Sequence, residues 1–340
     1  MRTGQAELLG VDLAHITTGP VLEVRDLSVI YRTKAGDVGA VKDVSFDLAK
    51  GEFLGIVGES GCGKTTLLFA VAQLLSHPAE ITGGSVRYKG VDLTELSEAQ
   101  LATIRWKNLS LVMQSAMNAL NPVKRIGAQF SDAMRAHGST PNEIAERSVE
   151  VMRMVGIDPI HLKSYPHQLS GGMRQRSMIA MAMLYTPDLV IMDEPTSALD
   201  VVAQRSLMVQ IKELQERLGF AIIFVTHDMS LVSHYSDRLM VMYAGEVAEL
   251  GTTRTVFDTP RHPYSIGLLD AFPSIHGDKV PLTGIPGSPP NLASPPDGCR
   301  FAPRCPRVIE RCKAAPIDLF RVEDVLVRCI RTGNGVGSDD

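Results

Sequence analysis

Hydrophobic and polar residues alternate in two stretches near the start of the chain, VLEVRDLSVIY (21–31) and AVKDVSFDLA (40–49). A period of two is typical of antiparallel β-strands with one solvent-exposed face. The run EFLGIVG (52–58) is almost wholly apolar and predicts a short buried strand. Two further runs, SVRYKG (85–90) and LSLVMQ (109–114), also favour strands. The first third of the chain is therefore predicted to be rich in β-structure.

The pattern becomes helical between about residues 118 and 183, where apolar residues recur three and four positions apart, as in NEIAERSVEVMRMVG (142–156). Strand character returns in DLVIMDEP (188–195) and FAIIFVTH (220–227), with a helical pattern between these two runs. Strands that alternate with helices indicate a mainly parallel sheet wrapped by helices. After about residue 260 the chain is Pro-rich and is expected to be irregular.

Composition excludes several classes of protein. The chain has 340 residues, with 44% hydrophobic and 21% charged residues, which is ordinary for a globular protein. A net charge of -4 argues against a broad nucleic-acid surface. No apolar run is long enough to span a membrane, and the N-terminus lacks a signal-peptide pattern. We expect a soluble, cytoplasmic protein unless a partner holds it at a membrane, and we expect no disulfides.

The stretch GESGCGKTT (58–66) fits the pattern G-x-x-x-x-G-K-[ST] of a phosphate-binding loop, or P-loop. Such a loop turns backbone N–H groups toward a phosphate chain, and the helix that follows points its positive end at the anion. Lys64 is expected to contact the β- and γ-phosphates, and the Thr65 hydroxyl to bind Mg²⁺. The predicted nucleotide-binding residues of this stretch are Gly58, Glu59, Ser60, Gly61, Cys62, Gly63, Lys64, Thr65 and Thr66.

Two carboxylates follow the apolar run LVIM and form the second motif. Asp193 is expected to hold Mg²⁺, directly or through water, and Glu194 to polarise the water that attacks the γ-phosphorus. The alternative is that both residues cap a strand and face solvent, which is less favoured in a chain with a P-loop. The third motif, LSGGMRQR (169–176), opens a helix with a serine cap and glycines that leave N–H groups uncovered.

These motifs, in the order P-loop, LSGGMRQR, DEPTSALD and THD, resemble those of ABC-type ATPases, the nucleotide-binding subunits of ABC transporters. The resemblance implies an α/β fold with an antiparallel β subdomain, a mainly parallel core sheet and a helical subdomain. It places a tail at 1–20, the nucleotide-binding domain at 21–260 with its helical subdomain at about 118–183, and a Pro- and Cys-rich extension at 261–340.

The resemblance also implies roles for residues that no local pattern singles out. Tyr31 would stack on adenine, although it could equally be an ordinary sheet residue. Gln114 would contact Mg²⁺ or the attacking water, and His227 the γ-phosphate. Two such cassettes pack head to tail, so the signature residues would cover the nucleotide of a second ATPase. The residues facing this second cassette would be Ser170, Gly171, Gly172 and Gln175, with Ser197 and Asp200 of the D-loop.

The end of the chain narrows the family. TPRHPYSIGLLDAFP (259–273) and IPGSPPNLASPPDGCRFAPRCP (285–306) resemble the C-terminal extension of the D-type ATP-binding subunit of oligopeptide and dipeptide permeases. This implies ATP and Mg²⁺ as cofactors, an F-type ATPase partner, two transmembrane permease subunits and an extracellular solute-binding protein. It also implies a peripheral place on the cytoplasmic face of the membrane, with no nucleic-acid partner.

The cargo stays open at this point, because importers of nickel, oligosaccharides and opines belong to the same branch and an ATPase subunit does not contact the cargo. A non-transport ABC ATPase is less favoured, since the chain lacks a long coiled coil and carries a single set of motifs.

Four cysteines lie near the end of the chain: Cys299, Cys305, Cys312 and Cys329. Their C-x5-C-x6-C-x16-C spacing matches neither a zinc ribbon nor a ferredoxin. Spacing alone leaves open four reduced thiols, a structural Zn²⁺ or a [4Fe–4S] cluster. The resemblance to peptide permease subunits favours the iron–sulfur cluster, which would supply folding energy to a short extension.

Overall fold

The computed structural model describes residues 19–113, 119–197, 199–271 and 284–332. The chain divides into two compact units, and each is assembled from separate stretches. The first unit comprises Met1–Glu23, Asp47–Glu52 and Arg87–Phe224, and the second comprises Val24–Phe46, Phe53–Val86 and Val225–Asp340. The chain therefore passes repeatedly between the two units.

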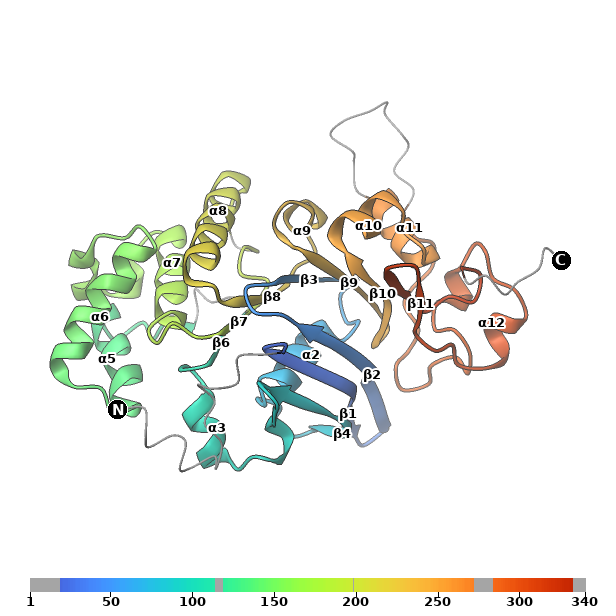
Figure 1. Cartoon of the computed structure of the whole chain (residues 1–340), viewed down its shortest axis with the longest axis horizontal. Helices are drawn as coiled ribbons and strands as arrows, with labels where there is room; N and C mark the ends of the chain where they lie inside the picture. The colour runs from blue at the N-terminus through green and yellow to red at the C-terminus, as the bar shows by residue number, and fades with distance from the viewer. Residues whose placement is uncertain (1–18, 114–118, 198, 272–283, 333–340) are drawn as a thin grey trace. The chain divides into compact units, whose positions relative to one another are not determined.

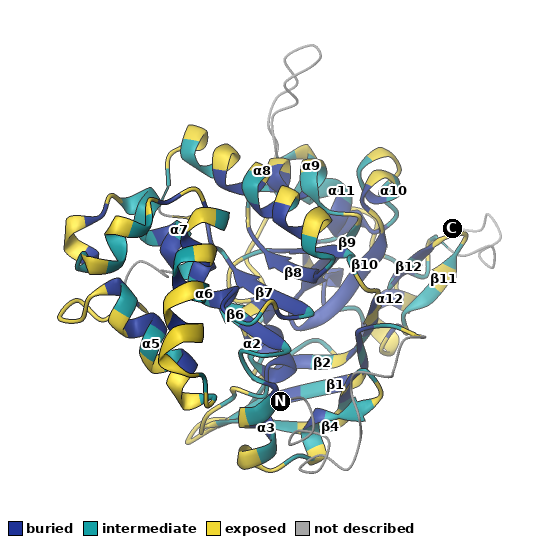
Figure 2. Cartoon of the chain, turned by 60° about the vertical axis from the view of Figure 1, so that its left-hand side comes forward, coloured by how far each residue is buried: buried dark blue, intermediate teal, exposed yellow. Residues whose placement is uncertain are grey.

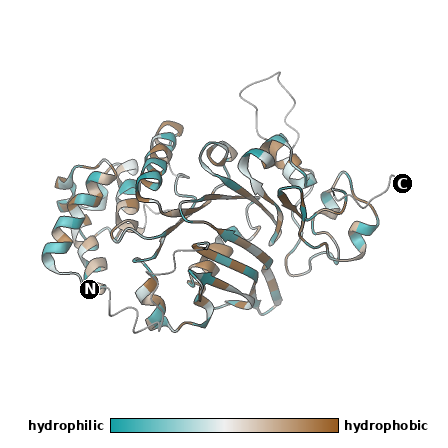
Figure 3. Ribbon diagram, in the orientation of Figure 1, coloured by the Kyte–Doolittle hydropathy of each residue, from teal (hydrophilic) through white to brown (hydrophobic). Residues whose placement is uncertain are grey.

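One sheet of the second unit is built from the alternating stretches near the start of the chain. Its strands β1 (Leu22–Thr33), β2 (Gly36–Leu48) and β4 (Ala79–Tyr88) pair in the order β2-β1-β4. Apolar and polar residues alternate along β1 and β2, as Figure 3 shows. Burial follows the same period along most of each strand, so one face of this sheet forms core. The end of β4 pairs antiparallel with β5 (Val91–Asp92).

The other sheet of the second unit has the order β11-β12-β10-β9-β3. The short apolar strand β3 is buried throughout and runs parallel to β9, whereas β9, β10, β12 and β11 pair antiparallel. Its strands are β3 (Phe53–Val57), β9 (Arg238–Tyr243), β10 (Glu246–Thr252), β11 (Phe320–Val322) and β12 (Val325–Val327). The helices of the second unit are α2 (Lys64–Val71), α9 (Met229–Tyr235), α10 (Thr253–Asp258), α11 (Pro263–Asp270) and α12 (Arg311–Ala314), with the 3₁₀ turn η4 (Ala302–Arg304).

The C-terminal extension is more regular than the sequence indicates. Strand β12 pairs with β10 through Glu249↔Val327 and Leu250↔Leu326, so the extension continues a sheet. Val325 and Val327 are fully buried, and Tyr264 and Phe301 are buried as well. Much of the described segment is irregular, as expected, since residues 284–300 form no helix or strand. The expectation that it has little core is wrong, because paired strands and aromatic side chains supply that core.

The first unit carries the strands β6 (Leu109–Val112), β7 (Leu189–Asp193) and β8 (Ala221–Val225), in the order β8-β7-β6. Every residue of β7 and β8 is buried, as the dark blue ribbons of Figure 2 show. Strand β6 runs parallel to β7. Continuous apolar runs are expected for parallel strands covered on both faces, and the predicted parallel core sheet is confirmed here.

Helices make up the remainder of the first unit, and α5, α6 and α7 stand together in Figure 1. They lie within the range that the sequence marks as helical. The helices are α3 (Glu98–Ile104), α5 (Ile126–Ala136), α6 (Pro141–Met154), α7 (Gly171–Ala182) and α8 (Val201–Leu218), with the 3₁₀ turns η1 (Leu93–Glu95), η2 (Pro159–Lys163) and η3 (Pro166–Gln168).

Side-chain caps fix where these helices begin. Thr140 and Glu143 form a reciprocal capping box at the start of α6, and Asp200 accepts a hydrogen bond from the Ala203 N–H at the start of α8. Helix α8 ends at Leu218, and the capping residue Gly219 has a positive φ of 72°, a left-handed conformation that glycine adopts without strain.

Candidate functional site

The loop between β3 and α2 is the P-loop predicted from the sequence. Gly58 and Gly63 have positive φ values of 153° and 99°. A Cβ atom at Gly58 would lie 2.2 Å from the Met242 carbonyl oxygen, and one at Gly63 would lie 2.2 Å from the Ala40 carbonyl oxygen. Both glycines are therefore required by close packing of the loop against neighbouring backbone.

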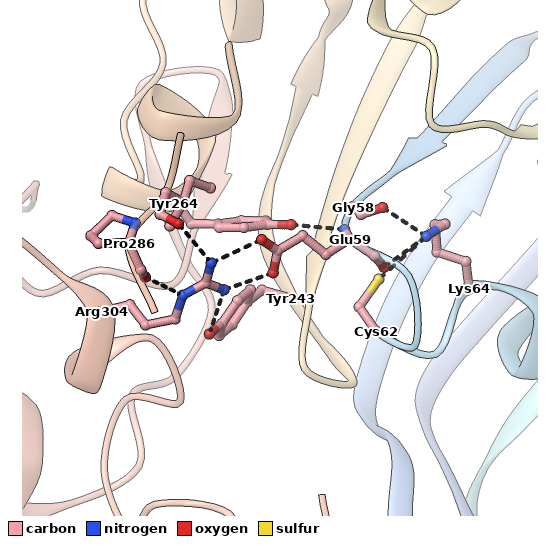
Figure 4. A network of polar contacts seen from close by, with 9 residues as sticks. Gly58, Glu59, Cys62, Lys64, Tyr243, Tyr264, Pro286 and Arg304 are labelled. Carbon is pink, nitrogen blue, oxygen red and sulfur yellow. Dashed lines mark hydrogen bonds and ion pairs between the residues drawn. The ribbon is translucent and has the colours of Figure 1, made fainter. Parts of the chain in front are cut away.

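Lys64, the first residue of α2, is buried with 7% of its surface exposed. Its ammonium donates hydrogen bonds to the carbonyl oxygens of Gly58 at 2.7 Å and Glu59 at 3.0 Å, and it lies 3.7 Å from the Cys62 sulfur (Figure 4). Within the described residues of the second unit, no carboxylate pairs with this ammonium. A buried positive charge held only by neutral groups favours the binding of an anion.

The other predicted residues of the loop surround this ammonium. Cys62 is buried, and burial raises the pKa of its thiol although Lys64 opposes the shift. Ser60, Gly61 and Thr65 are exposed, whereas Thr66 is buried. The Tyr31 hydroxyl on β1 lies 3.0 Å from the Thr66 hydroxyl on α2, so this ring is tied to the helix of the P-loop.

Glu59 makes contacts that the sequence does not reveal. Its carboxylate binds the guanidinium of Arg304, and its backbone N–H donates to the Tyr264 hydroxyl (Figure 4). Both partners belong to the C-terminal part of the chain, more than 200 positions further on. No local motif signals such a pairing.

Asp193 and Glu194 lie in the first unit, at the end of β7. Asp193 is the last residue of the buried strand and is 5% exposed. Glu194 has a φ of 45°, which is uncommon for a residue with a side chain. The turn after Glu194 is closed by hydrogen bonds to its carbonyl oxygen, which the Ser197 N–H and the Ser197 hydroxyl donate at 3.3 and 3.1 Å. Backbone strain of this kind is concentrated at functional sites.

The glycine-containing helix start at Ser170 is also in the first unit. Ser170 caps α7, and its hydroxyl accepts a hydrogen bond from the Met173 N–H at 3.2 Å. A Cβ atom at Gly172 would meet nothing within 4 Å, so nothing in the described chain requires a glycine there. Gln175, predicted to share the same face, is buried with 3% exposed.

The remaining predicted residues are distributed over both units. His227 follows β8 and is exposed, in the second unit. In the first unit Asp200 caps α8, and Ser197 is exposed. Gln114 lies outside the described residues.

The prediction of an iron–sulfur cluster is wrong. The cysteines 299, 305, 312 and 329 are free and border one cavity of about 10 Å³, which has room for little more than a water molecule. Among residues 19–113, 119–197, 199–271 and 284–332, no group of three or more His, Cys, Asp or Glu side chains is placed to hold a metal ion. Burial raises the pKa of the Cys299 thiol to about 11.

Two family models match separate parts of the chain, one containing Glu59 and the other containing its partner Arg304. The ABC transporter model matches residues 41–197, and the model for the C-terminal region of oligopeptide/dipeptide transporters matches residues 248–312. An AAA domain model, described as a putative AbiEii toxin of a type IV toxin–antitoxin system, matches residues 162–233. The oligopeptide transport ATP-binding protein OppD of Salmonella typhimurium is 46% identical over 87% of this chain and 89% of its own length. The chain belongs to the ABC transporter ATP-binding proteins.

Further relatives of this ABC transporter ATPase carry similar names. The dipeptide transport ATP-binding protein DppD of Bacillus subtilis is 43% identical over 91% of this chain and 94% of its own length. Among solved structures, the ATP-binding cassette MJ0796, a dimer bound to ADP and phosphate, has a TM-score of 0.62 at 27% identity and covers 68% of this chain and 99% of its own. CbiO1 of Clostridium perfringens, part of an ABC transporter complex, has a TM-score of 0.63 at 28% identity over 71% of this chain and 92% of its own.

The ABC transporter ATPase therefore has the predicted fold, and it is an ATPase coupled to transport. In the part of the chain that the structure describes, no helix is both long and apolar enough to cross a membrane.

Proposed function

We propose that this ABC transporter ATPase hydrolyses ATP to energise the uptake of oligopeptides or dipeptides across the cytoplasmic membrane. The observation that carries the proposal is the buried ammonium of Lys64, which is held by carbonyl oxygens at the start of α2 without a carboxylate partner in the described second unit. A triphosphate is the anion that this loop geometry and helix start favour. The named relatives in peptide transport support the cargo.

The proposal assigns separate tasks to the two units. In the second unit Lys64 binds the phosphates, Tyr31 contacts the adenine and Thr65 offers its hydroxyl to Mg²⁺. In the first unit Asp193 offers a carboxylate to the same ion. Glu194 accepts a proton from the attacking water, which Gln114 and His227 orient. When bound, Mg²⁺ neutralises charge on the β- and γ-phosphate oxygens.

The proposal also includes a second ATPase. We infer that Ser170, Gly171 and Gly172 face the nucleotide of this partner, with Ser197 and Asp200 nearby, whereas Gln175 is buried and does not reach it. The unoccupied space beside Gly172 supports an approach from outside the chain. We propose that this partner is an F-type subunit and that both ATPases bind two permease subunits at the cytoplasmic face of the membrane. An extracellular solute-binding protein would deliver the cargo to the permeases. We also propose the domain boundaries given above: a tail at 1–20, a nucleotide-binding domain at 21–260 with a helical subdomain at about 118–183, and a C-terminal extension at 261–340.

Peptide uptake by cells that lack the chromosomal gene tests the proposed cargo. Wild-type protein supplied from a plasmid is expected to restore the uptake of a labelled tripeptide or dipeptide, while uptake of labelled nickel stays unchanged. Glu194→Gln protein, expressed to the same level, serves as the control and is expected not to restore peptide uptake. Restored nickel uptake without peptide uptake would contradict the cargo assignment.

Ser170→Arg is expected to reduce nucleotide trapping on the partner ATPase at least ten-fold while the chain's own site keeps its nucleotide. The reason is that a long cation at the start of α7 would block the face that covers the partner's phosphates. Trapping of 8-azido-ATP with vanadate, followed by separation of the two ATPase subunits, measures each site.

Ser97→Arg is the matched control for this experiment, because Ser97 also caps a helix through its hydroxyl but belongs to α3. This control is expected to leave both sites trapped as in the wild type. Loss of trapping at the chain's own site in Ser170→Arg would show that the signature acts in cis.

A further inference from the structure

The side chain of Arg304 joins the C-terminal extension to the P-loop. Its guanidinium donates to the Glu59 carboxylate at 2.7 and 2.9 Å in a two-pronged pair, and only 4% of the Arg304 side chain is exposed (Figure 4). Further bonds run to the carbonyl oxygens of Pro286 at 2.8 Å and Ile285 at 3.3 Å, and to the Tyr243 hydroxyl at 3.3 Å. All five N–H donors of the arginine thus have an acceptor, which fixes the guanidinium in place.

A second contact joins the same two segments. The Tyr264 hydroxyl on α11 accepts a hydrogen bond from the Glu59 backbone N–H at 2.9 Å. The Tyr264 ring is fully buried and packs against Tyr243 with centroids 4.5 Å apart and against Phe301 with centroids 5.5 Å apart. Both the backbone and the side chain of Glu59 are therefore held by the extension, on a rigid aromatic base.

Glu59 is an unfavourable residue for a loop that binds phosphate, because its carboxylate repels a triphosphate at short range. Its carbonyl oxygen accepts a hydrogen bond from the Lys64 ammonium, so Glu59 belongs to the loop that holds this ammonium, while its carboxylate is directed toward Arg304 (Figure 4). The two-pronged bond from Arg304 offsets that negative charge and directs it toward the extension. The same contacts order the loop in advance, so binding a nucleotide requires less loss of conformational freedom.

We propose that Arg304 is a positioning residue for ATP: by holding and neutralising Glu59, it makes the nucleotide affinity of the P-loop depend on the C-terminal extension. This inference rests on the proposed function of the Lys64 loop. Because coupling between two sites is reciprocal, a nucleotide on the loop must also stabilise the segment that carries Arg304.

The test is calorimetric titration of the full chain with the non-hydrolysable analogue MgAMP-PNP. Arg304→Met keeps the apolar stem and removes the charge, and it is expected to raise the Kd about ten-fold. Adding Glu59→Gln to this variant is expected to bring the Kd back to within about three-fold of the wild type, because the uncompensated charge is gone. A purely structural role for Arg304 would produce no such recovery.

Arg328→Met is the matched control. Arg328 also links the extension to the sheet, through hydrogen bonds to the Val247 and Ile317 carbonyl oxygens, and within the described residues neither of these bonds reaches the P-loop. This variant is expected to lower the melting temperature while the Kd for MgAMP-PNP stays as in the wild type. A rise in Kd equal to that of Arg304→Met would show that any weakening of the extension suffices, and it would overturn the specific role of Arg304.

Hydrogen exchange of the wild-type chain gives an independent readout if Arg304→Met does not fold. Saturating MgAMP-PNP is expected to slow amide exchange in the segment from Arg300 to Pro306, and unchanged exchange there would contradict the coupling. If the wild-type chain bound no MgAMP-PNP at all, the proposed function would fail. If it bound while Arg304→Met bound equally well, only the inference about Arg304 would be overturned.

Discussion

Glu194→Gln is expected to bind MgATP as the wild type does while its rate of ATP hydrolysis falls about 1,000-fold. A positioned general base contributes on the order of 10² to 10⁴ to a rate, and an amide cannot accept the proton of the attacking water. The uncommon φ of 45° at Glu194 follows directly on the buried strand β7, so the backbone holds this residue in a defined direction. Phosphate release by the complete importer at saturating ATP measures the rate.

The control for this variant is Glu216→Gln, which removes the charge of an exposed glutamate on α8. Its hydrolysis rate is expected to equal that of the wild type. Unimpaired hydrolysis in Glu194→Gln would remove Glu194 from the catalytic assignment, while lost nucleotide binding would assign it to binding instead.

Lys64→Ala is expected to raise the Kd for MgATP about 100-fold, since truncating one member of a buried charge pair between protein and ligand is costly. The variant also releases the carbonyl oxygens of Gly58 and Glu59 from their hydrogen bonds, so part of the effect comes from a less ordered loop. Calorimetric titration measures the Kd, and the melting temperature shows whether the fold persists.

Lys50→Ala is the control for that measurement, because Lys50 is an exposed lysine that lies outside the P-loop, residues 58–66. It is expected to bind MgATP with wild-type affinity. Wild-type affinity in Lys64→Ala would contradict the assignment of residues 58–66 as the phosphate-binding loop.

The parts of the site that the sequence predicts are those built by neighbouring residues. A strand, a glycine loop and a helix start lie within a few positions of one another around Lys64, and Asp193 directly follows its apolar strand. The sequence pattern identifies Gly58 and Gly63 as parts of a phosphate-binding loop. The structure adds a reason for both glycines, since a Cβ at either position would collide with a carbonyl oxygen.

The parts that the sequence does not predict depend on distant contacts. Glu59 and Arg304 are separated by 245 positions, and no periodicity or spacing rule joins them. Strands β11 and β12 have three residues each, too few for an alternation to stand out beside Pro-rich segments. The cysteines show the converse error, because the resemblance to peptide permease subunits favoured a cluster, whereas no group of three or more metal-binding side chains is placed to hold a metal ion among the described residues.

The interleaved composition of the two units has a consequence for synthesis on the ribosome. The second unit combines Val24–Phe46 and Phe53–Val86 with residues from Val225 onward, so strand β3 must wait for its partner β9 until a late part of the chain has emerged. During that interval the P-loop lacks the Met242 backbone, the Tyr264 ring and the guanidinium of Arg304 against which it packs. Exposed strands that wait for distant partners are prone to aggregate. Production of this protein is therefore expected to be sensitive to truncation at its C-terminus and to the supply of chaperones.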